Sequence, residues 1–247
     1  MYFSDKRAAT IDHYYWLSDP LLAAWISDHL SHYGSSICEL GAGSGTMLSN
    51  LMSTFSRVIL TEPSVPMFQR LTNITSQYTD TSFEIKNCPA EATDLPSKVV
   101  DVILAKSCLH HFANSAAAFE EMLRLANNAV GIVEVIAPDI ACLPYLRDLL
   151  IGKEPTRNPD TIFTSATLLN ATLPLGSVRR LLYFDQYIDL QAWLENGELP
   201  MDEVKNLMAY AEGQSGLVRE KMQMHYRSGR FVQLRRMGLL ITELTHD

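Results

Sequence analysis

The chain has 247 residues, 47% of them hydrophobic and 19% charged, with a formal net charge of −8. Its length suits one domain with a substantial core, and its composition excludes an intrinsically disordered chain. The acidic excess argues against a nucleic-acid partner, because a phosphate backbone requires a concentrated cationic face, and it favours a small neutral or cationic substrate.

The first predicted elements are one or two helices between Ile11 and His32, where apolar residues recur at helical spacing. Asp19 followed by Pro20 indicates a helix start, because aspartate caps a helix and proline is tolerated in its first turn. We expect residues 1–35 to form an N-terminal helical cap.

Short apolar runs alternate with helical segments between residues 36 and 137. Each run ends in small or polar residues, which is typical of buried parallel strands. The alternation predicts an α/β fold with a doubly wound, mostly parallel sheet. The expected strands are Ser36 to Leu40, Arg57 to Thr61, Ser82 to Lys86, Val100 to Ala105 and Val130 to Ile136, and the expected helices are Thr46 to Phe55, Val65 to Tyr78 and Ser115 to Asn127.

The pattern changes after Pro138. An extended run follows two helices, and a mostly helical insertion at about 190–229 precedes a last alternating run that predicts a long closing strand or a hairpin. We expect all of 1–247 to form a single domain. The expected elements of this half are helices Ile140 to Leu150, Ser165 to Leu173, Leu190 to Glu195, Met201 to Ala211 and Leu217 to Tyr226, and the runs Val178 to Ile188 and Arg230 to Leu244.

Four cysteines lie far apart without a CxxC pair, and they predict buried reduced thiols. The N-terminus has no signal pattern, and no apolar run approaches the roughly 18 residues of a membrane span. No group of His, Cys, Asp and Glu has metal-ligand spacing. We therefore expect a cytoplasmic protein with no membrane partner and no metal.

A glycine-rich turn, Glu39-Leu40-Gly41-Ala42-Gly43-Ser44-Gly45, joins the first strand to the next helix. Glycines let backbone N–H groups and a helix N-terminus approach a ligand closely, although a tight turn of this kind also has a purely structural explanation. Glu62 ends the second strand, at the place where α/β cofactor folds put an acid for ribose hydroxyls. The glycine-rich turn and Glu62 together predict a cofactor site.

The glycine turn is the first of four ordered segments between about Ile37 and Ile136, and the others are Glu62 to Met67, Ala90 to Pro96 and Val100 to Phe112. Together they resemble the class I S-adenosylmethionine-dependent methyltransferases, of the small-molecule type 11 group. The resemblance implies a Rossmann-like fold with seven strands, a cofactor-binding core at 36–137, and a substrate-side half at 138–247 in which the helical insertion acts as a cap. The implied cofactor is S-adenosyl-L-methionine. The implied cofactor-binding residues are Glu39, Gly41, Ala42, Gly43, Glu62, Pro63, Met67, Ala90, Glu91 and Lys106.

Two segments depart from the family pattern. Many relatives carry an aspartate before the alanine of the adenine-binding stretch, where this chain has Pro89, so Glu91 or the backbone would take that contact. Before the fifth strand, Asn127 to Gly131 stands where relatives often have a Lys-Pro-Gly-Gly turn. For Lys106 we expect its backbone, more than its amine, to touch the cofactor.

His110 and His111 lie on the loop after the fourth strand, where the acceptor should meet the cofactor. Histidine titrates near neutrality and can remove a proton from a hydroxyl or an acidic C–H acceptor. Some small-molecule methyltransferases use a histidine at the position of His110 with an N-terminal tyrosine, for which Tyr14 or Tyr15 is available. A structural role for the pair, capping or packing a helix start, remains open.

The leading hypothesis is a methyltransferase, monomeric or homodimeric, that transfers the sulfonium methyl in line to an O, N or C atom of a small-molecule acceptor. A second hypothesis keeps the cofactor but rearranges or cyclises the substrate without methylation. A third is a non-catalytic binding subunit, suggested by the two departures. An NAD-linked oxidoreductase fits less well, because the chain lacks a second catalytic domain.

Overall fold

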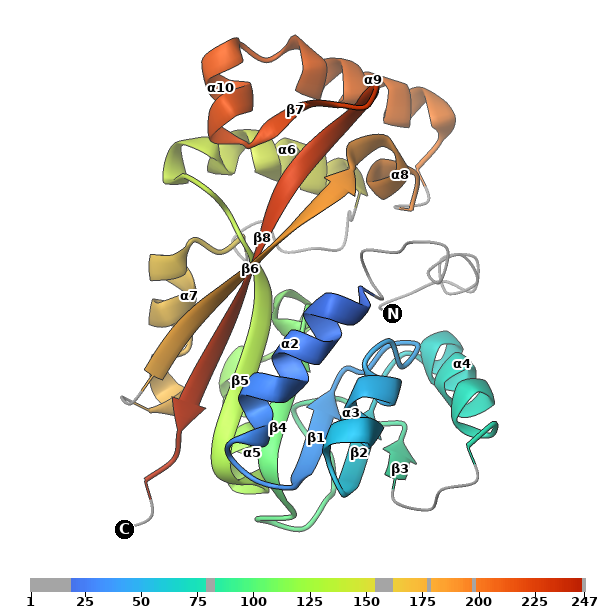
Figure 1. Ribbon diagram of the computed structural model, residues 1–247, viewed down its shortest axis with the longest axis vertical. Coiled ribbons are helices and arrows are strands. Elements are labelled where there is room, and N and C mark those ends of the chain that lie inside the picture. Colours follow the sequence, from blue (N-terminus) through green and yellow to red (C-terminus); the bar gives the residue numbers. More distant parts are fainter. Residues whose placement is uncertain (1–18, 79–82, 154–161, 177–178, 197–198, 246–247) are drawn as a thin grey trace.

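A central β-sheet of eight strands organises the residues that the computed structural model describes, 19–78, 83–153, 162–176, 179–196 and 199–245 (Figure 1). The strand order is β3-β2-β1-β4-β5-β8-β6, with β7 paired to β8. Strands β1 to β5 are parallel, and β8 runs antiparallel to its neighbours. The predicted doubly wound, mostly parallel sheet is confirmed, with one strand added. The strands are β1 (Ser36–Leu40), β2 (Arg57–Thr61), β3 (Phe83–Lys86), β4 (Val100–Lys106), β5 (Ala126–Ile136), β6 (Arg179–Asp189), β7 (Met224–Arg227) and β8 (Arg230–Glu243).

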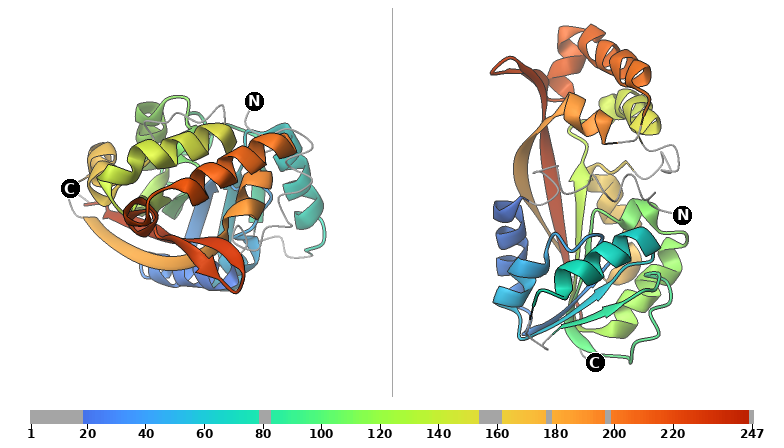
Figure 2. Two further views of the ribbon diagram at one scale, coloured as in Figure 1. Left: turned by 90° about the horizontal axis from the view of Figure 1, so that it is seen from above. Right: turned by 90° about the vertical axis from the view of Figure 1, so that its right-hand side faces the viewer.

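Helices cover both faces of the sheet (Figure 2). Side chains alternate along a strand, so Ile37 of β1 packs with the helices of one face and Cys38 with those of the other. Two buried apolar clusters result, one on each face, and they hold the parallel strands in place. The first face carries α2 (Pro20–Ser31), α3 (Leu48–Thr54) and α4 (Val65–Thr75), and the second carries α5 (Ser115–Leu125) and α7 (Ser165–Ala171).

Helix α2 begins where Asp19 and Pro20 predicted it. The Oδ1 atom of Asp19 accepts hydrogen bonds from the backbone N–H groups of Leu21 at 2.9 Å and Leu22 at 3.3 Å. This cap satisfies donors that the first helical turn leaves without intrahelical partners. The earlier part of the predicted helical region, including Tyr14, lies outside the described residues.

Helix α5 runs into β5 without a turn, so the prediction of a helix to Asn127 was wrong in its last two residues. The strand begins at Ala126 because its first residues already pair with β4, and Asn128 donates from Nδ2 to the Tyr33 carbonyl at 2.6 Å. A Cβ added at Gly131 would come within 2.8 Å of Leu30 of α2. The unusual 127–131 segment therefore belongs to a strand on which α2 packs closely.

Strands β6 and β8 continue beyond the parallel strands and carry a cap, drawn at the top of Figure 1. The cap has an apolar cluster of its own, which includes Leu149, Trp193, Val204 and Met222. Its helices are α6 (Leu143–Lys153), α8 (Leu190–Glu195), α9 (Met201–Gly213) and α10 (Gly216–Lys221), preceded by the short helix η3 (Ile140–Cys142). The predicted helical insertion is present as a separately packed unit on shared strands.

The prediction of a helix from Leu217 to Tyr226 was wrong at its C-terminal end, where β7 replaces it. Ser228 and Gly229 both have positive φ, at 50° and 78°, which is the backbone of a two-residue hairpin turn. This turn folds β7 back onto β8, whose Arg230 pairs with Arg227. Pairing with a neighbouring strand overrides the helical spacing of the apolar residues.

All four cysteines carry free thiols. Cys38, Cys108 and Cys142 are buried as predicted, whereas Cys88 is only half-buried. In the described ranges, no helix combines the length and the apolar character needed to cross a membrane. The same ranges contain no cluster of three or more His, Cys, Asp and Glu side chains that could hold a metal ion.

Candidate cofactor site

A cavity opens at the carboxyl ends of β1, β2 and β4. The carboxyl edge of a doubly wound sheet is where such folds bind ligands. All ten residues predicted to bind a cofactor, from Glu39 to Lys106, contribute to its lining. His111 and five residues to which the sequence gave no individual role complete the lining. These five are Ser44, Thr46, Ser107, Cys108 and Phe112.

The glycine turn forms one wall of the cavity. Gly41 and Gly43 have positive φ angles of 72° and 60°, which L-residues with side chains rarely adopt. A Cβ added at Gly41 would also approach Cys108 Cβ to 3.0 Å. Glycine is thus required both by the backbone conformation and by the close approach of the loop after β4.

Glu62 holds this turn from the end of β2. Its Oε2 accepts from the Gly43 N–H at 2.8 Å and its Oε1 from the Ser64 N–H at 2.8 Å. Burial raises the pKa of Glu62, and the two backbone hydrogen bonds act in the opposite direction by stabilising the carboxylate. Each carboxylate oxygen accepts more than one hydrogen bond, so Glu62 can hold the turn and also receive ligand hydroxyls.

Glu39 and Lys106 form the floor of the cavity. The Glu39 side chain is buried, and its Oε2 has no hydrogen-bond partner within the described part of the chain. Burial raises the pKa of Glu39 to about 7, against the lowering effect of Lys106, and burial likewise lowers the pKa of Lys106. A buried acceptor of this kind calls for a donor. The amino group of an S-adenosylmethionine molecule has the charge and hydrogen atoms to supply one.

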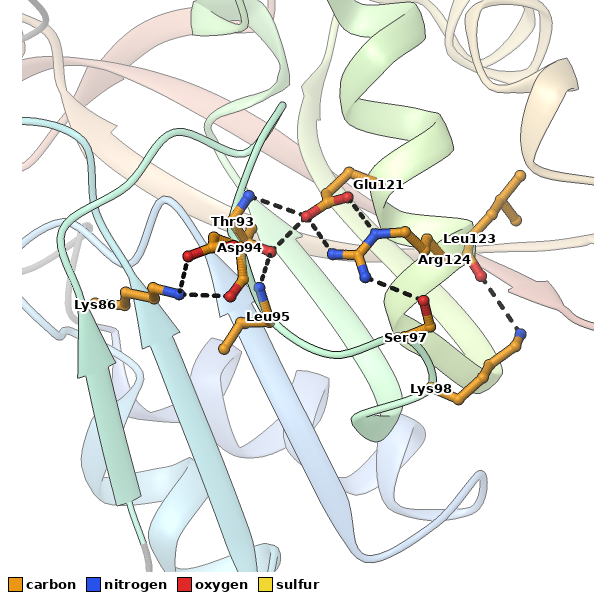
Figure 3. Close-up of polar contacts among 9 residues, drawn as sticks. All are labelled: Lys86, Thr93, Asp94, Leu95, Ser97, Lys98, Glu121, Leu123 and Arg124. Atoms are coloured by element: carbon orange, nitrogen blue, oxygen red, sulfur yellow. Dashed lines mark hydrogen bonds and ion pairs between the residues drawn. The ribbon is translucent and has the colours of Figure 1, made fainter.

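The stretch predicted to bind adenine is held in place by a polar cluster shown in Figure 3. Thr93 donates to Glu121 Oε1 from its backbone N at 2.9 Å and from its hydroxyl at 2.5 Å. Arg124 pairs with the same carboxylate, at 2.7 Å from Nε to Oε2, and lowers the pKa of Glu121 to about 2. An ionised, fully bonded carboxylate thus anchors the segment that contains Ala90.

Glu91 lines the cavity while it binds the start of α5. Its Oε1 accepts from the backbone N–H groups of Ala113 at 2.8 Å and Asn114 at 3.2 Å. A carboxylate is favoured there, because a helix N-terminus presents unpaired N–H groups and a positive dipole end. Pro89, beside it, has no side-chain acceptor, so the aspartate contact of other relatives has no counterpart at that position.

The two predicted catalytic histidines have different surroundings. Both lie on the short helix η2 (Leu109–His111), but His111 lines the cavity and His110 does not. The Nδ1 of His110 lies 3.0 Å from Oε2 and 3.2 Å from Oε1 of Glu134, which is fully buried on β5. The two imidazole rings are in contact, with centroids 4.1 Å apart.

Sequence reasoning missed Glu134. The available signal was a single acidic residue inside the apolar run Val130 to Ile136, since a buried charge is rare unless it is paired. Its partner could not be found from spacing, because His110 lies 24 residues earlier on another strand's loop.

The comparisons with known proteins agree with this geometry. Residues 38–129 match the methyltransferase domain family. YcgJ from Bacillus subtilis is 14% identical with a TM-score of 0.75, over 87% of this chain and 94% of that one. A candidate methyltransferase from Bacillus halodurans is 13% identical with a TM-score of 0.76, over 88% and 96%. The [4+2]-cyclase SpnF is 15% identical with a TM-score of 0.52, over 88% and 80%. No curated protein matches the sequence significantly.

The chain therefore has the Rossmann-like fold of the class I methyltransferases. The match of residues 38–129 to the methyltransferase domain family confirms the resemblance that the motifs predicted.

Proposed function

We propose that this protein is an S-adenosylmethionine-dependent methyltransferase that acts on a small molecule. One observation carries the proposal: the buried, unpartnered Oε2 of Glu39 and the carboxylate of Glu62 line the same cavity, beside the turn formed by Gly41 and Gly43. A cationic amino group and two ribose hydroxyls are the donors that two such acids would receive. When bound, the cofactor supplies an electrophilic methyl group on a sulfonium centre.

Each part of the cavity has a role in this proposal. Glu39 would accept from the amino group, and the N–H groups of the glycine turn would face the methionine part. Glu62 and the following Pro63 would hold the ribose. Met67, Ala90 and Glu91 would flank the adenine, and Lys106 would support the site beside Glu39.

The acceptor would react next to the loop after β4. His111 in the cavity wall, His110 behind it, and Tyr14 of the N-terminal segment are the groups that we propose to receive or orient an acceptor proton. Residues 138–247 would form the acceptor side, with the cap excluding water from the reacting groups. The substrate determines whether the methyl group is transferred to an O, N or C atom.

A second candidate function keeps the cofactor and omits methyl transfer. The similarity of the fold to a cyclase supports it, because the same scaffold can hold a positive sulfonium beside a substrate that rearranges. Product mass separates the two functions. A product heavier by one methyl group supports the methyltransferase, and unchanged mass supports the rearrangement.

Calorimetry with S-adenosylhomocysteine tests the proposal before any acceptor is known. The wild type should bind, whereas Glu39→Gln and Glu62→Gln should each bind at least about tenfold more weakly, since each removes a charged acceptor. Glu243→Gln, a carboxylate bonded to Tyr33 at the far end of the sheet, is the matched control and should bind like the wild type. Absence of binding by the wild type would overturn the proposal and favour a non-catalytic subunit.

Methyl transfer is then measured with labelled S-adenosylmethionine and panels of small hydroxyl, amine and carbon-acid acceptors. Transfer to one class identifies the acceptor atom. Tight cofactor binding without transfer to any panel would contradict the methylation step and leave cyclisation as the tested alternative.

A further inference from the structure

Glu134 stands apart from the other acids of the carboxyl edge, because it faces a side chain and not only backbone. It is fully buried, and its Oε1 accepts from the Leu109 N–H at 2.9 Å. Both of its oxygens also lie within 3.2 Å of His110 Nδ1. His110 itself is 9% exposed. A buried carboxylate thus contacts both the backbone and one ring nitrogen of the same short helix.

This contact determines which nitrogen of His110 carries the proton. A carboxylate only accepts hydrogen bonds, so Nδ1 must be the donor to Glu134. In a neutral imidazole the lone pair then belongs to Nε2. The tautomer of a histidine is set by the partner of its other nitrogen, and here that partner is a fixed carboxylate.

We propose that Glu134 is a positioning residue that holds His110 in the Nδ1–H tautomer, so that Nε2 is the proton-accepting atom of the loop. Glu134 does this while it also binds Leu109 N, so the ring and the backbone of η2 are oriented together. His110 in turn contacts His111, whose side chain lines the cavity.

The consequence for chemistry rests on the proposed function. A proton that leaves an acceptor hydroxyl would form a bond to Nε2 of His110, and the electron pair of the broken O–H bond would stay on the acceptor oxygen. The resulting imidazolium would keep its Nδ1–H on Glu134, whose negative charge stabilises it.

Nitrogen-15 NMR of histidine-labelled, ligand-free protein at about pH 8 tests the proposal, because ring nitrogens with and without a proton have different shifts. The chain has seven histidines, so the His110 signals are assigned by their loss in His110→Gln. We expect a proton on Nδ1 and none on Nε2 in the wild type. A proton on Nε2 with none on Nδ1 would overturn the proposal. If both nitrogens carry a proton, the pH is raised until one proton leaves, and loss from Nδ1 overturns the proposal whereas loss from Nε2 supports it.

The Glu134→Gln variant distinguishes a role in orienting the His110 ring from a role in supporting the loop alone. The glutamine oxygen can still accept from Leu109 N, but its NH₂ group would then face His110 Nδ1 as a donor. We expect the tautomer to invert, with the proton on Nε2. An unchanged tautomer in a folded Glu134→Gln protein would show that Glu134 does not determine it. If this variant does not fold, the wild-type spectrum decides alone.

Glu243→Gln is the control for removal of a carboxylate elsewhere, and it should leave the His110 signals unchanged. Calorimetry with S-adenosylhomocysteine on the same samples keeps the two proposals distinct. Cofactor binding with the wrong tautomer overturns the role of Glu134 only, and the expected tautomer without cofactor binding overturns the proposed function only.

Discussion

The carboxyl edge of the sheet and the cap differ in the kind of side chain that they bury. At the edge, Glu39, Glu62 and Glu134 are all buried, and two of them bind backbone N–H groups of the loops that shape the site. In the cap, the interior is an apolar cluster around Trp193. Its charged pairs, such as Asp139 with Lys221, lie toward solvent. The edge thus buries acids that can accept hydrogen bonds, whereas apolar packing stabilises the cap.

Removing the centre of the cap should have the largest effect on stability. Trp193 is 4% exposed, and the Arg235 guanidinium lies 4.8 Å from its ring centroid. We expect Trp193→Ala to lower the free energy of unfolding by about 3–5 kcal/mol through the cavity it leaves. Urea denaturation measures this. Trp193→Phe, which refills part of the space, should lose clearly less.

The same variant tests whether edge and cap are independent. At temperatures where Trp193→Ala is folded, its affinity for S-adenosylhomocysteine should stay within about twofold of the wild type, since additivity holds for separated sites. A tenfold loss would show that cap packing and the cofactor site are coupled.

Glu62→Ala should give the next largest effect, on binding. It removes the acceptor for Gly43 N and Ser64 N and the proposed acceptor for ribose hydroxyls. With about 1.5–3 kcal/mol for each hydrogen bond to a charged group, we expect at least a hundredfold weaker binding of S-adenosylhomocysteine. Calorimetry measures this. Glu220→Ala in the cap should bind like the wild type. A comparable loss of affinity in that variant would show that acids of the edge and of the cap do not differ in their effect on binding.

The affinity for the cofactor should rise with pH through about 7. Burial raises the pKa of Glu39 to about 7, so the ligand-free protein keeps this carboxyl protonated below that value. A cationic amino group binds the ionised form, and binding therefore releases the proton. Between pH 6 and pH 8 the ionised fraction grows roughly tenfold, and we expect a similar gain in affinity. Glu39→Gln should show a flat profile in the same calorimetric series, and a wild-type profile equally flat would contradict the role of Glu39.

The smallest effect is expected for a surface pair on β6 and β8, the strands that carry the cap. Arg236 donates to Asp185 through two contacts of 2.7 and 2.8 Å and lowers the pKa of that carboxyl, but both side chains are more than a third exposed. Solvent screening limits such a pair to below about 1 kcal/mol. Asp185→Asn should therefore change the unfolding free energy by less than that in urea titrations. A loss of about 3 kcal/mol would show that the strands that carry the cap depend on this charged pair.

The local parts of the fold and site could be predicted because their causes lie within a few residues. The Asp19–Pro20 cap, the glycine turn with its positive φ angles and the buried strands follow from local sterics and periodicity. The ten residues predicted to bind a cofactor meet in one cavity because each lies at or shortly after the carboxyl end of a parallel strand. Sheet topology then brings these loops together.

The remaining features depend on partners far apart in the sequence. The strand β7 exists because β8 pairs with it, although the apolar spacing of its residues favoured a helix. Glu91 binds the start of α5, and Glu134 binds His110, across separations of 22 and 24 residues. Periodicity has no information about such pairs, because any acid of the chain could have been the partner.

The sequence by itself determined the α/β class, the strand order along the chain and the acids at the ends of β1 and β2, since local conformation and burial decide these. The tertiary structure alone decided that His111 lines the cavity while His110 binds Glu134. It also decided that the cap packs around its own core. The physical reason is that a buried polar group takes whichever partner the packing of distant segments brings within hydrogen-bond distance.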